Sequence, residues 1–201
     1  MTLSGREARP ASARWNVAKT LVQTVCFWSF FLFAIPPLVL IVEDAIGLGA
    51  WRFDAPLSRA AGVLLFALCG TLGLWSGITM AIIGAGTPVP FDCPRALVVR
   101  GPYRMTRNPM VIAGIGQGIA VGLFLGSPLV IAYALCGAVV WNAVVRPWEE
   151  RDLASRFGSA YETYRRDVPC WRCVMPRSSV PQPDSSESPS AAAQDHRSRA
   201  R

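Results

Sequence analysis

The chain has 201 residues, of which 52% are hydrophobic and only 16% are charged, and its formal net charge is +7. Because soluble domains carry about 25% charged residues, this composition indicates a single membrane domain rather than a soluble one. The arginines flank apolar segments, where they orient a membrane protein and contact anionic lipid. We therefore expect the lipid bilayer as a partner and no nucleic acid.

Residues 1–16 combine three arginines with Pro, Ser and Ala and are predicted to form a short disordered basic arm. The apolar run that follows is too long for the h-region of a signal peptide. Residues 17–42 can cross a hydrocarbon core of about 30 Å and form the first predicted span. Pro36 and Pro37 lie toward its far end and should kink the helix or end its regular hydrogen bonding.

The second predicted span covers residues 60–83. Gly70, Gly73 and Gly77 recur in it at helical spacing, which indicates a face on which another helix approaches closely. The loop that follows, residues 84–108, is rich in glycine, proline and arginine and is not expected to be helical.

Residues 110–125 and 129–145 form the third and fourth predicted spans. A Gly-Ser-Pro turn at residues 126–128 joins them, and their short length favours a tight helical hairpin with little tilt. Glycines at every fourth residue indicate close helix packing, with a substrate passage as the alternative. These glycines are Gly114, Gly118, Gly122 and Gly126.

The distribution of arginine predicts the topology. The N-terminal arm, the central loop and the region after residue 145 are basic, whereas the loop after the first span is not. The positive-inside rule then predicts four spans with both termini in the cytoplasm, and we expect the inner membrane of a bacterium. The alternative is three spans with one short re-entrant segment. The predicted fold is an all-α, polytopic membrane protein with about four transmembrane helices, including a tight helical hairpin, and a short cytosolic helical C-terminal region.

The region after the fourth span carries helix start and stop signals. Pro147 suits the first turn of a helix that would end near residue 156 at a glycine cap formed by Gly158. A capping box then predicts a second short helix that carries Tyr161 and Tyr164.

We place the membrane domain at residues 17–175 and a disordered tail, polar and rich in Ser, Pro and Ala, at residues 176–201. His196, the only histidine, lies in that tail, so histidine catalysis is not expected. Cys170 and Cys173 have Cys-x-x-Cys spacing, which suggests a membrane thiol–disulfide protein as a rival interpretation. The spacing lacks the βαβ context of such proteins. No zinc-binding spacing is present, and no metal site is predicted.

A set of short motifs follows a fixed order in the second half of the chain. The motifs are Gly101-Pro102-Tyr103-Arg104, Arg107-Asn108-Pro109-Met110, Glu149-Glu150-x-x-Leu153, Phe157-Gly158, Tyr161-x-x-Tyr164 and Val168-Pro169. Together they resemble the isoprenylcysteine carboxyl methyltransferase and phospholipid N-methyltransferase group of integral membrane methyltransferases, over roughly residues 81–169. The resemblance implies S-adenosylmethionine as the cofactor, bound at the cytosolic end of the helices. It also implies a lipid-like or small apolar methyl acceptor that comes from the bilayer.

The resemblance also implies the site residues. The cofactor-binding residues would be Gly84, Gly86, Tyr103, Arg104, Arg107, Asn108, Pro109, Met110, Glu149 and Glu150. Arg104 and Arg107 match a carboxylate bidentately, and the free N–H groups at the start of the third span add donors for an anion. Glu149 and Glu150 can accept hydrogen bonds from an ammonium, ribose or adenine amine. Arg104 and Glu149 are the predicted catalytic residues. The alternatives are that the arginines only anchor the topology and that the glutamates form a solvated helix start.

Two positions depart from the family pattern. Asn108 stands where most relatives carry histidine, and Cys170 stands where they tend to place arginine after Val-Pro. Asparagine forms hydrogen bonds but cannot act as a titrating base. A membrane scaffold that has lost the activity is therefore a further alternative.

The acceptor is predicted from what methyl transfer requires. A carboxylate or thiolate needs no general base, whereas a neutral amine must lose a proton to Glu149, Glu150 or a tyrosine. The lack of a site histidine favours the ionised acceptor, with phospholipid N-methylation as the alternative. Gln117 and Asn142, the polar side chains inside the last two spans, are the predicted substrate residues; the alternative is that they cross-link helices.

Overall fold

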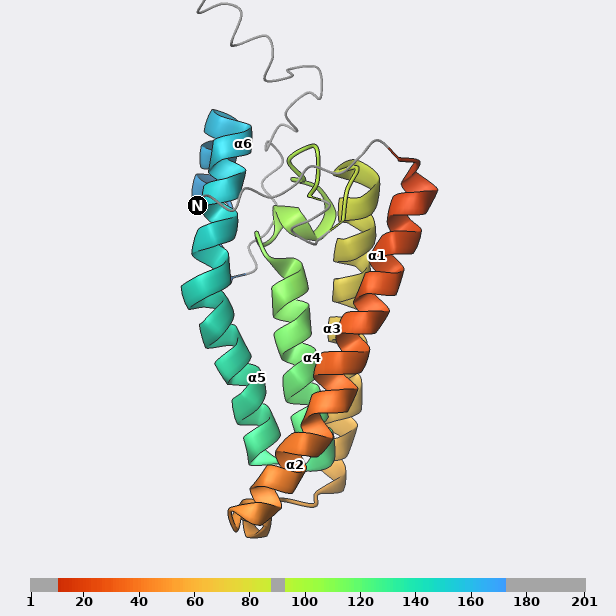
Figure 1. Ribbon diagram of the computed structural model, residues 1–201, viewed down its shortest axis with the longest axis vertical. Helices are drawn as coiled ribbons and strands as arrows, with labels where there is room; N and C mark the ends of the chain where they lie inside the picture. Colours follow the sequence, from red (N-terminus) through yellow and green to blue (C-terminus); the bar gives the residue numbers. More distant parts are fainter. Residues whose placement is uncertain (1–10, 88–92, 173–201) are drawn as a thin grey trace, which may run out of the picture.

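The computed structural model describes residues 11–87 and 93–172, which form helices joined by loops (Figure 1). The helices are α1 Ala13–Trp28, the π-helix η1 Ser29–Ala34, α2 Ile35–Ala45, the 3₁₀-helix η2 Leu48–Trp51, α3 Pro56–Ile83, the 3₁₀-helix η3 Gly101–Arg104, α4 Pro109–Leu125, α5 Pro128–Val140, the π-helix η4 Trp141–Val145 and α6 Arg146–Asp167. The predicted all-α fold is confirmed. The predicted tail, residues 176–201, and most of the predicted arm lie outside the described residues.

Among the described residues, three helices are long and apolar enough to cross a membrane, and α4 is a shorter apolar helix beside them. The three are Ala13–Ala45, Pro56–Ile83 and Pro128–Asp167. The four predicted spans each lie within one of these helices or α4. These three helices and α4 lie alongside one another in Figure 1, as expected for a multi-pass membrane protein.

The first and second helices begin earlier than predicted. Residues 13–16, assigned to the disordered arm, are helical, because Ser12 caps α1 by accepting a hydrogen bond from the Trp15 N–H at 3.3 Å. The second helix begins at Pro56 rather than residue 60, because proline at the first turn needs no N–H partner there.

Prolines inside the long helices do not end them, contrary to the separate helix predicted from Pro147. A π-helical segment precedes each proline site: η1 lies before Pro36, and η4 lies before Pro147. The wider turn of a π-helix leaves room for the proline ring and accommodates the absence of the proline N–H. The backbone hydrogen bonds shift by one residue there, and the helix continues. The break predicted at Gly158 is confirmed: its non-helical backbone, with φ 51° and ψ −128°, kinks α6 and divides it into two helices, the second of which carries Tyr161 and Tyr164.

Glycines allow the helices to pack closely. A Cβ atom at Gly73 would lie 3.3 Å from Ala113 Cβ on α4, and one at Gly77 would lie 3.1 Å from Thr20 Cγ2 on α1. The predicted glycine face of α3 is therefore where two helices approach it. The predicted α4–α5 hairpin is equally tight, since a Cβ at Gly118 would lie only 2.8 Å from Ala134 Cβ.

Different helix ends meet at the two ends of the bundle. One end holds the end of α2, the start of α3 and the α4–α5 turn; the other holds the starts of α1 and α4, the end of α3, and α6 (Figure 1). The helix Pro128–Asp167 has 40 residues and is kinked at Gly158; its part before the kink is about 45 Å long, longer than the roughly 30 Å of hydrocarbon. Its charged half, α6, therefore lies outside the hydrocarbon.

Candidate active site

A pocket opens at the α6 end of the bundle, between the end of α3, the loop after residue 93, the first turn of α4 and the first part of α6. Most of its wall is apolar. The wall residues are Met80, Cys93, Pro94, Ala96, Leu97, Val98, Tyr103, Arg107, Asn108, Pro109, Met110, Val111, Trp148, Glu149, Asp152, Leu153, Arg156, Phe157 and Tyr164. Six of the predicted cofactor-binding residues are among them: Tyr103, Arg107, Asn108, Pro109, Met110 and Glu149.

Gly84 and Gly86, two of the predicted cofactor-binding residues, lie behind this wall. The Gly84 carbonyl accepts hydrogen bonds from the backbone N–H groups of Arg95, at 2.7 Å, and Ala96, at 3.4 Å. A Cβ at Gly86 would lie 2.8 Å from the Cys93 carbonyl. The glycines thus let the returning loop cross the end of α3 at close range. They shape the pocket from outside, and their cofactor contact stays a prediction.

Tyr103 anchors the floor of the pocket. Its carbonyl accepts a hydrogen bond from the Tyr164 hydroxyl at 2.7 Å, which joins η3 to α6. Burial raises the pKa of both phenols well above their usual value. Both tyrosines therefore stay protonated near neutral pH, and neither suits the role of general base. Arg104, the next residue, lies beside the wall rather than in it.

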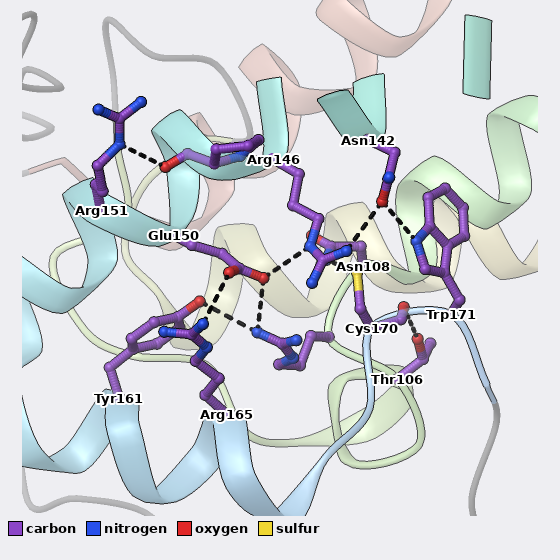
Figure 2. A network of polar contacts seen from close by, with 12 residues as sticks. Thr106, Asn108, Asn142, Arg146, Glu150, Arg151, Tyr161, Arg165, Cys170 and Trp171 are labelled. Carbon is purple, nitrogen blue, oxygen red and sulfur yellow. Dashed lines mark hydrogen bonds and ion pairs between the residues drawn. The ribbon is translucent and has the colours of Figure 1, made fainter. Parts of the chain in front are cut away.

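Glu150 lies outside the pocket wall, at the centre of a cluster of arginines (Figure 2). Its Oε1 accepts from Arg107 Nη1 and Arg146 Nε, both at 2.9 Å, and Arg165 Nη2 lies 3.7 Å from Oε2. Burial opposes ionisation, but the Arg146 hydrogen bond and the charges of Arg107 and Arg146 outweigh it and hold the pKa of Glu150 below its usual value. Glu150 thus holds Arg107 in the wall, and its own cofactor contact stays a prediction.

Glu149 is the opposite case. It lies in the wall, and among the described residues no side chain or backbone group forms a hydrogen bond or ion pair with its carboxylate. Burial, followed by the charges of Glu150 and Asp152, raises its pKa to about 7. The arginines of the wall do not compensate it, since Arg107 pairs with Glu150 and Arg156 pairs with Asp152 at 3.4 Å. A partly buried carboxylate of this kind favours a ligand with a positive charge.

The segment after α6 folds back onto the start of α4 (Figure 2). The Thr106 hydroxyl donates to the Cys170 carbonyl at 2.7 Å, and the Arg107 N–H donates to the Pro169 carbonyl at 3.0 Å. Asn108 Nδ2 donates to Cys170 Sγ at 3.2 Å. The two residues that depart from the family pattern are therefore in contact. Nothing in the sequence pattern indicates this contact between residues so far apart in the chain.

The two predicted substrate residues do not line the pocket. Gln117 is fully buried on α4, and its Nε2 would lie 3.5 Å from a Cβ at Gly70 on α3. Asn142 is exposed, and its Oδ1 accepts from Arg146 Nη1 and Trp171 Nε1, both at 2.9 Å (Figure 2). Asn142 thus links the helix to the segment after α6, and its predicted contact with the substrate stays a prediction.

A helical membrane bundle with a mostly apolar pocket at one polar end defines the general class of this protein. The sequence model of the phospholipid methyltransferase family matches residues 57–160, more than half of the chain. The chain therefore belongs to the phospholipid methyltransferase family, which confirms the resemblance found in the sequence. The match covers α3, the pocket loop, the α4–α5 hairpin and most of α6, and it supports a membrane-embedded methyltransferase. A comparison with curated proteins gives no match.

Proposed function

We propose that the chain transfers a methyl group from S-adenosylmethionine, bound in the pocket, to a lipid-like or small apolar acceptor that comes from the bilayer. The observation that carries the proposal is the Glu149 carboxylate, which lies in the pocket wall without a cationic partner among the described residues. S-adenosylmethionine has two positive centres, a sulfonium and an ammonium, and either would compensate Glu149.

The residues of the wall fit the other parts of the cofactor. Met110 and Val111 carry the first backbone N–H groups of α4, which suit a carboxylate. Leu153 and Phe157 offer apolar surface for an adenine ring. Arg107, held by Glu150, places a fixed positive charge at the same wall. Arg104 lies beside the wall, so the catalytic role predicted for it receives no support from the pocket.

The bound cofactor would supply an activated methyl group on a positive sulfur. The chain's own task is to hold the two reactants in line and to exclude water, and both tasks suit a mostly apolar pocket at the membrane edge. An ionised carboxylate or thiolate is the first candidate for the acceptor, because its negative charge disappears as the sulfonium is discharged and no base is needed. The two enclosed tyrosines leave Glu149 as the wall residue suited to a base.

The second candidate for the acceptor is the amine of a phospholipid headgroup. It is favoured by Glu149, whose pKa of about 7 lets it accept a proton near neutral pH. The two candidates predict different pH profiles: methylation of a thiolate or carboxylate should not depend on Glu149 as a base, whereas amine methylation should be lost when that residue cannot accept a proton.

We further propose that the pocket faces the cytosol of a bacterium, with the described helices beginning and ending on that side of the inner membrane. The start of α1, the pocket loop and α6 lie at one end of the bundle (Figure 1). The arginines of the loop and α6 gather there too, as the positive-inside rule requires.

The test combines binding and acceptor assays on the purified chain in lipid nanodiscs. Calorimetry should show binding of S-adenosylmethionine by the unaltered chain and a loss of about 100-fold in affinity for Glu149→Gln, which removes a charge pair with the ligand. Glu162→Gln, on the exposed side of α6, is the matched control and should bind normally. Labelled cofactor offered with prenylcysteine, phospholipid, small-thiol and fatty-acid acceptors then identifies the acceptor class. Absence of binding in the unaltered chain, or equal affinity in Glu149→Gln, would overturn the proposal.

A further inference from the structure

The start of α4 lacks the cap that its own sequence provides. Asparagine is among the strongest N-cap residues, because its side-chain oxygen accepts a hydrogen bond from the second or third N–H of the helix. Asn108 holds the N-cap position, yet its side chain forms no hydrogen bond with α4. Pro109 has no N–H, so Met110 and Val111 carry the first donors, and both line the pocket.

A contact with Cys170, which follows α6 in the sequence, holds the Asn108 side chain away from these donors. Its Nδ2 donates to Cys170 Sγ at 3.2 Å (Figure 2). The sulfur cannot move freely, because Cys170 is 7% exposed and its carbonyl accepts from the Thr106 hydroxyl at 2.7 Å. The adjacent Pro169 carbonyl accepts from the Arg107 N–H at 3.0 Å. The thiol is thus a fixed acceptor.

We propose that Cys170 is a positioning residue, which holds the Asn108 side chain off the first turn of α4 and so leaves the N–H groups of Met110 and Val111 open to an anionic group of the ligand. The inference rests on the proposed function, in which that group is the carboxylate of S-adenosylmethionine. An open helix N-terminus attracts an anion through its N–H groups and the helix dipole.

Glu149 supports the same ligand independently. Its carboxylate lies in the same pocket without a partner among the described residues, so the wall offers one unpartnered carboxylate and one set of anion-binding donors. This pair of features matches a zwitterion, such as the amino-acid end of S-adenosylmethionine, better than it matches a simple anion or cation. A self-capped α4 would leave only half of that recognition.

The measurement compares Cys170→Ala and Cys170→Ser with the unaltered chain. Removal of the thiol frees the Asn108 amide to cap α4. Cys170→Ala should then bind S-adenosylmethionine roughly tenfold more weakly, as when one hydrogen bond to a charged group is lost. The KM for the cofactor should rise while kcat changes little. Cys170→Ser should behave like the unaltered chain, because its hydroxyl still accepts from the amide.

A purely structural role for Cys170 predicts different results. It would lower the Tm in Cys170→Ala and leave the affinity of the folded fraction unchanged. The positioning role instead predicts that the affinity loss disappears in the Asn108→Ala background, where no side chain is left to cap the helix. Equal losses in both backgrounds, or no loss in either, would overturn the inference.

Backbone hydrogen exchange of the ligand-free chain separates this inference from the proposed function. The peptide that contains Met110 and Val111 should exchange more slowly in Cys170→Ala than in the unaltered chain, because the freed Asn108 protects those amides. Unchanged exchange would contradict the positioning role even if the chain binds the cofactor. Slower exchange in a chain that does not bind S-adenosylmethionine would contradict only the identity of the ligand.

Discussion

Glu43 and Glu149 lie at opposite ends of the bundle, and their surroundings differ completely. Glu43, 1% exposed, accepts from the Ser127 hydroxyl at 2.9 and 3.0 Å, from the Leu129 N–H at 3.3 Å and from Arg52 Nε at 2.7 Å. The other carboxylate, in the pocket wall, has no such partner among the described residues.

The difference shows how one residue type serves two purposes. Glu43 joins the end of α2 to the start of α5, and Arg52 also donates to the Leu40 carbonyl at 2.8 Å. We call this hydrogen-bonded network of Glu43, Arg52, Ser127 and Leu129 the clamp. A buried charge with all its partners holds elements together, because removal of any one partner leaves another unpaired. A carboxylate without partners does not hold elements together in the free protein and is available to a ligand. The comparison therefore separates the end of the bundle at which paired charges hold helices together from the end that contains the pocket.

The largest expected effect is on the clamp. Glu43→Ala leaves the Arg52 guanidinium and the Ser127 hydroxyl without their shared partner and should lower the free energy of unfolding by about 3–5 kcal/mol. Denaturant unfolding in detergent micelles measures this value, with Glu162→Ala as the control on an exposed surface. The fraction that remains folded should bind S-adenosylmethionine normally. If Glu43→Ala were stable but bound S-adenosylmethionine more weakly, the ligand site would lie at the Glu43 end of the bundle, which would contradict the assignment of the pocket.

A pH series should show the next largest effect, at the pocket. Because the folded-state pKa of Glu149, about 7, lies above the usual value for a glutamate, its protonated form is favoured by folding. The stability that this residue contributes is present at acidic pH and is lost as the pH rises through 7.

Binding of a positive ligand should show the opposite trend. Affinity should rise by about tenfold between pH 6 and pH 8, as the ionised fraction of Glu149 increases. Calorimetry at several pH values measures the trend, and Glu149→Gln should abolish both dependences. A flat affinity profile in the unaltered chain would show that the carboxylate does not contact the ligand's charge.

The smallest expected effect comes from removing one bond of the clamp. Ser127 both caps α5, by accepting from the Val130 N–H at 3.1 Å, and donates to Glu43. Ser127→Ala should cost about 1 kcal/mol of unfolding free energy, the usual value of an N-cap. Ser58→Ala is a suitable control in the same unfolding assay, because the Ser58 hydroxyl donates to the Ala55 carbonyl near the start of α3 and takes no part in the clamp. An effect no larger than that of the control would mean that Arg52 and Leu129 satisfy the glutamate without the serine.

Local signals in the sequence determined where most helices begin and end. Pro109 and Pro128 start α4 and α5, and Gly126, with φ 64°, ends α4 in the left-handed conformation that glycine adopts easily. The same signals fail at the prolines inside the long helices, because the π-turns that accommodate Pro36 and Pro147 depend on the whole rod and its neighbours. Local sequence signals predict where a helix can end, whereas packing against neighbouring helices decides whether the helix continues through that point.

The order of the motifs likewise determined that Tyr103, Arg107 and Asn108 would meet the start of α6, and the pocket wall contains them. Which of the two adjacent glutamates faces the pocket was decided only by the tertiary structure. Neighbouring residues on a helix point about 100° apart, so the rotation of α6 after η4 turns Glu149 inward and leaves Glu150 to the arginines.

Contacts between distant parts of the chain could not be predicted from the sequence either, because they also depend on how each helix is rotated about its axis. A polar residue inside a span indicates a role but not a direction, and the rotations of the helices send Gln117 toward α3 and Asn142 toward Trp171. The Asn108–Cys170 hydrogen bond joins residues that are separated by the entire hairpin and α6. The sequence by itself therefore determined the helices, the family and the chemistry available at the pocket. The tertiary structure decided which side chains use that chemistry, because orientation around a helix axis is set by packing rather than by residue type.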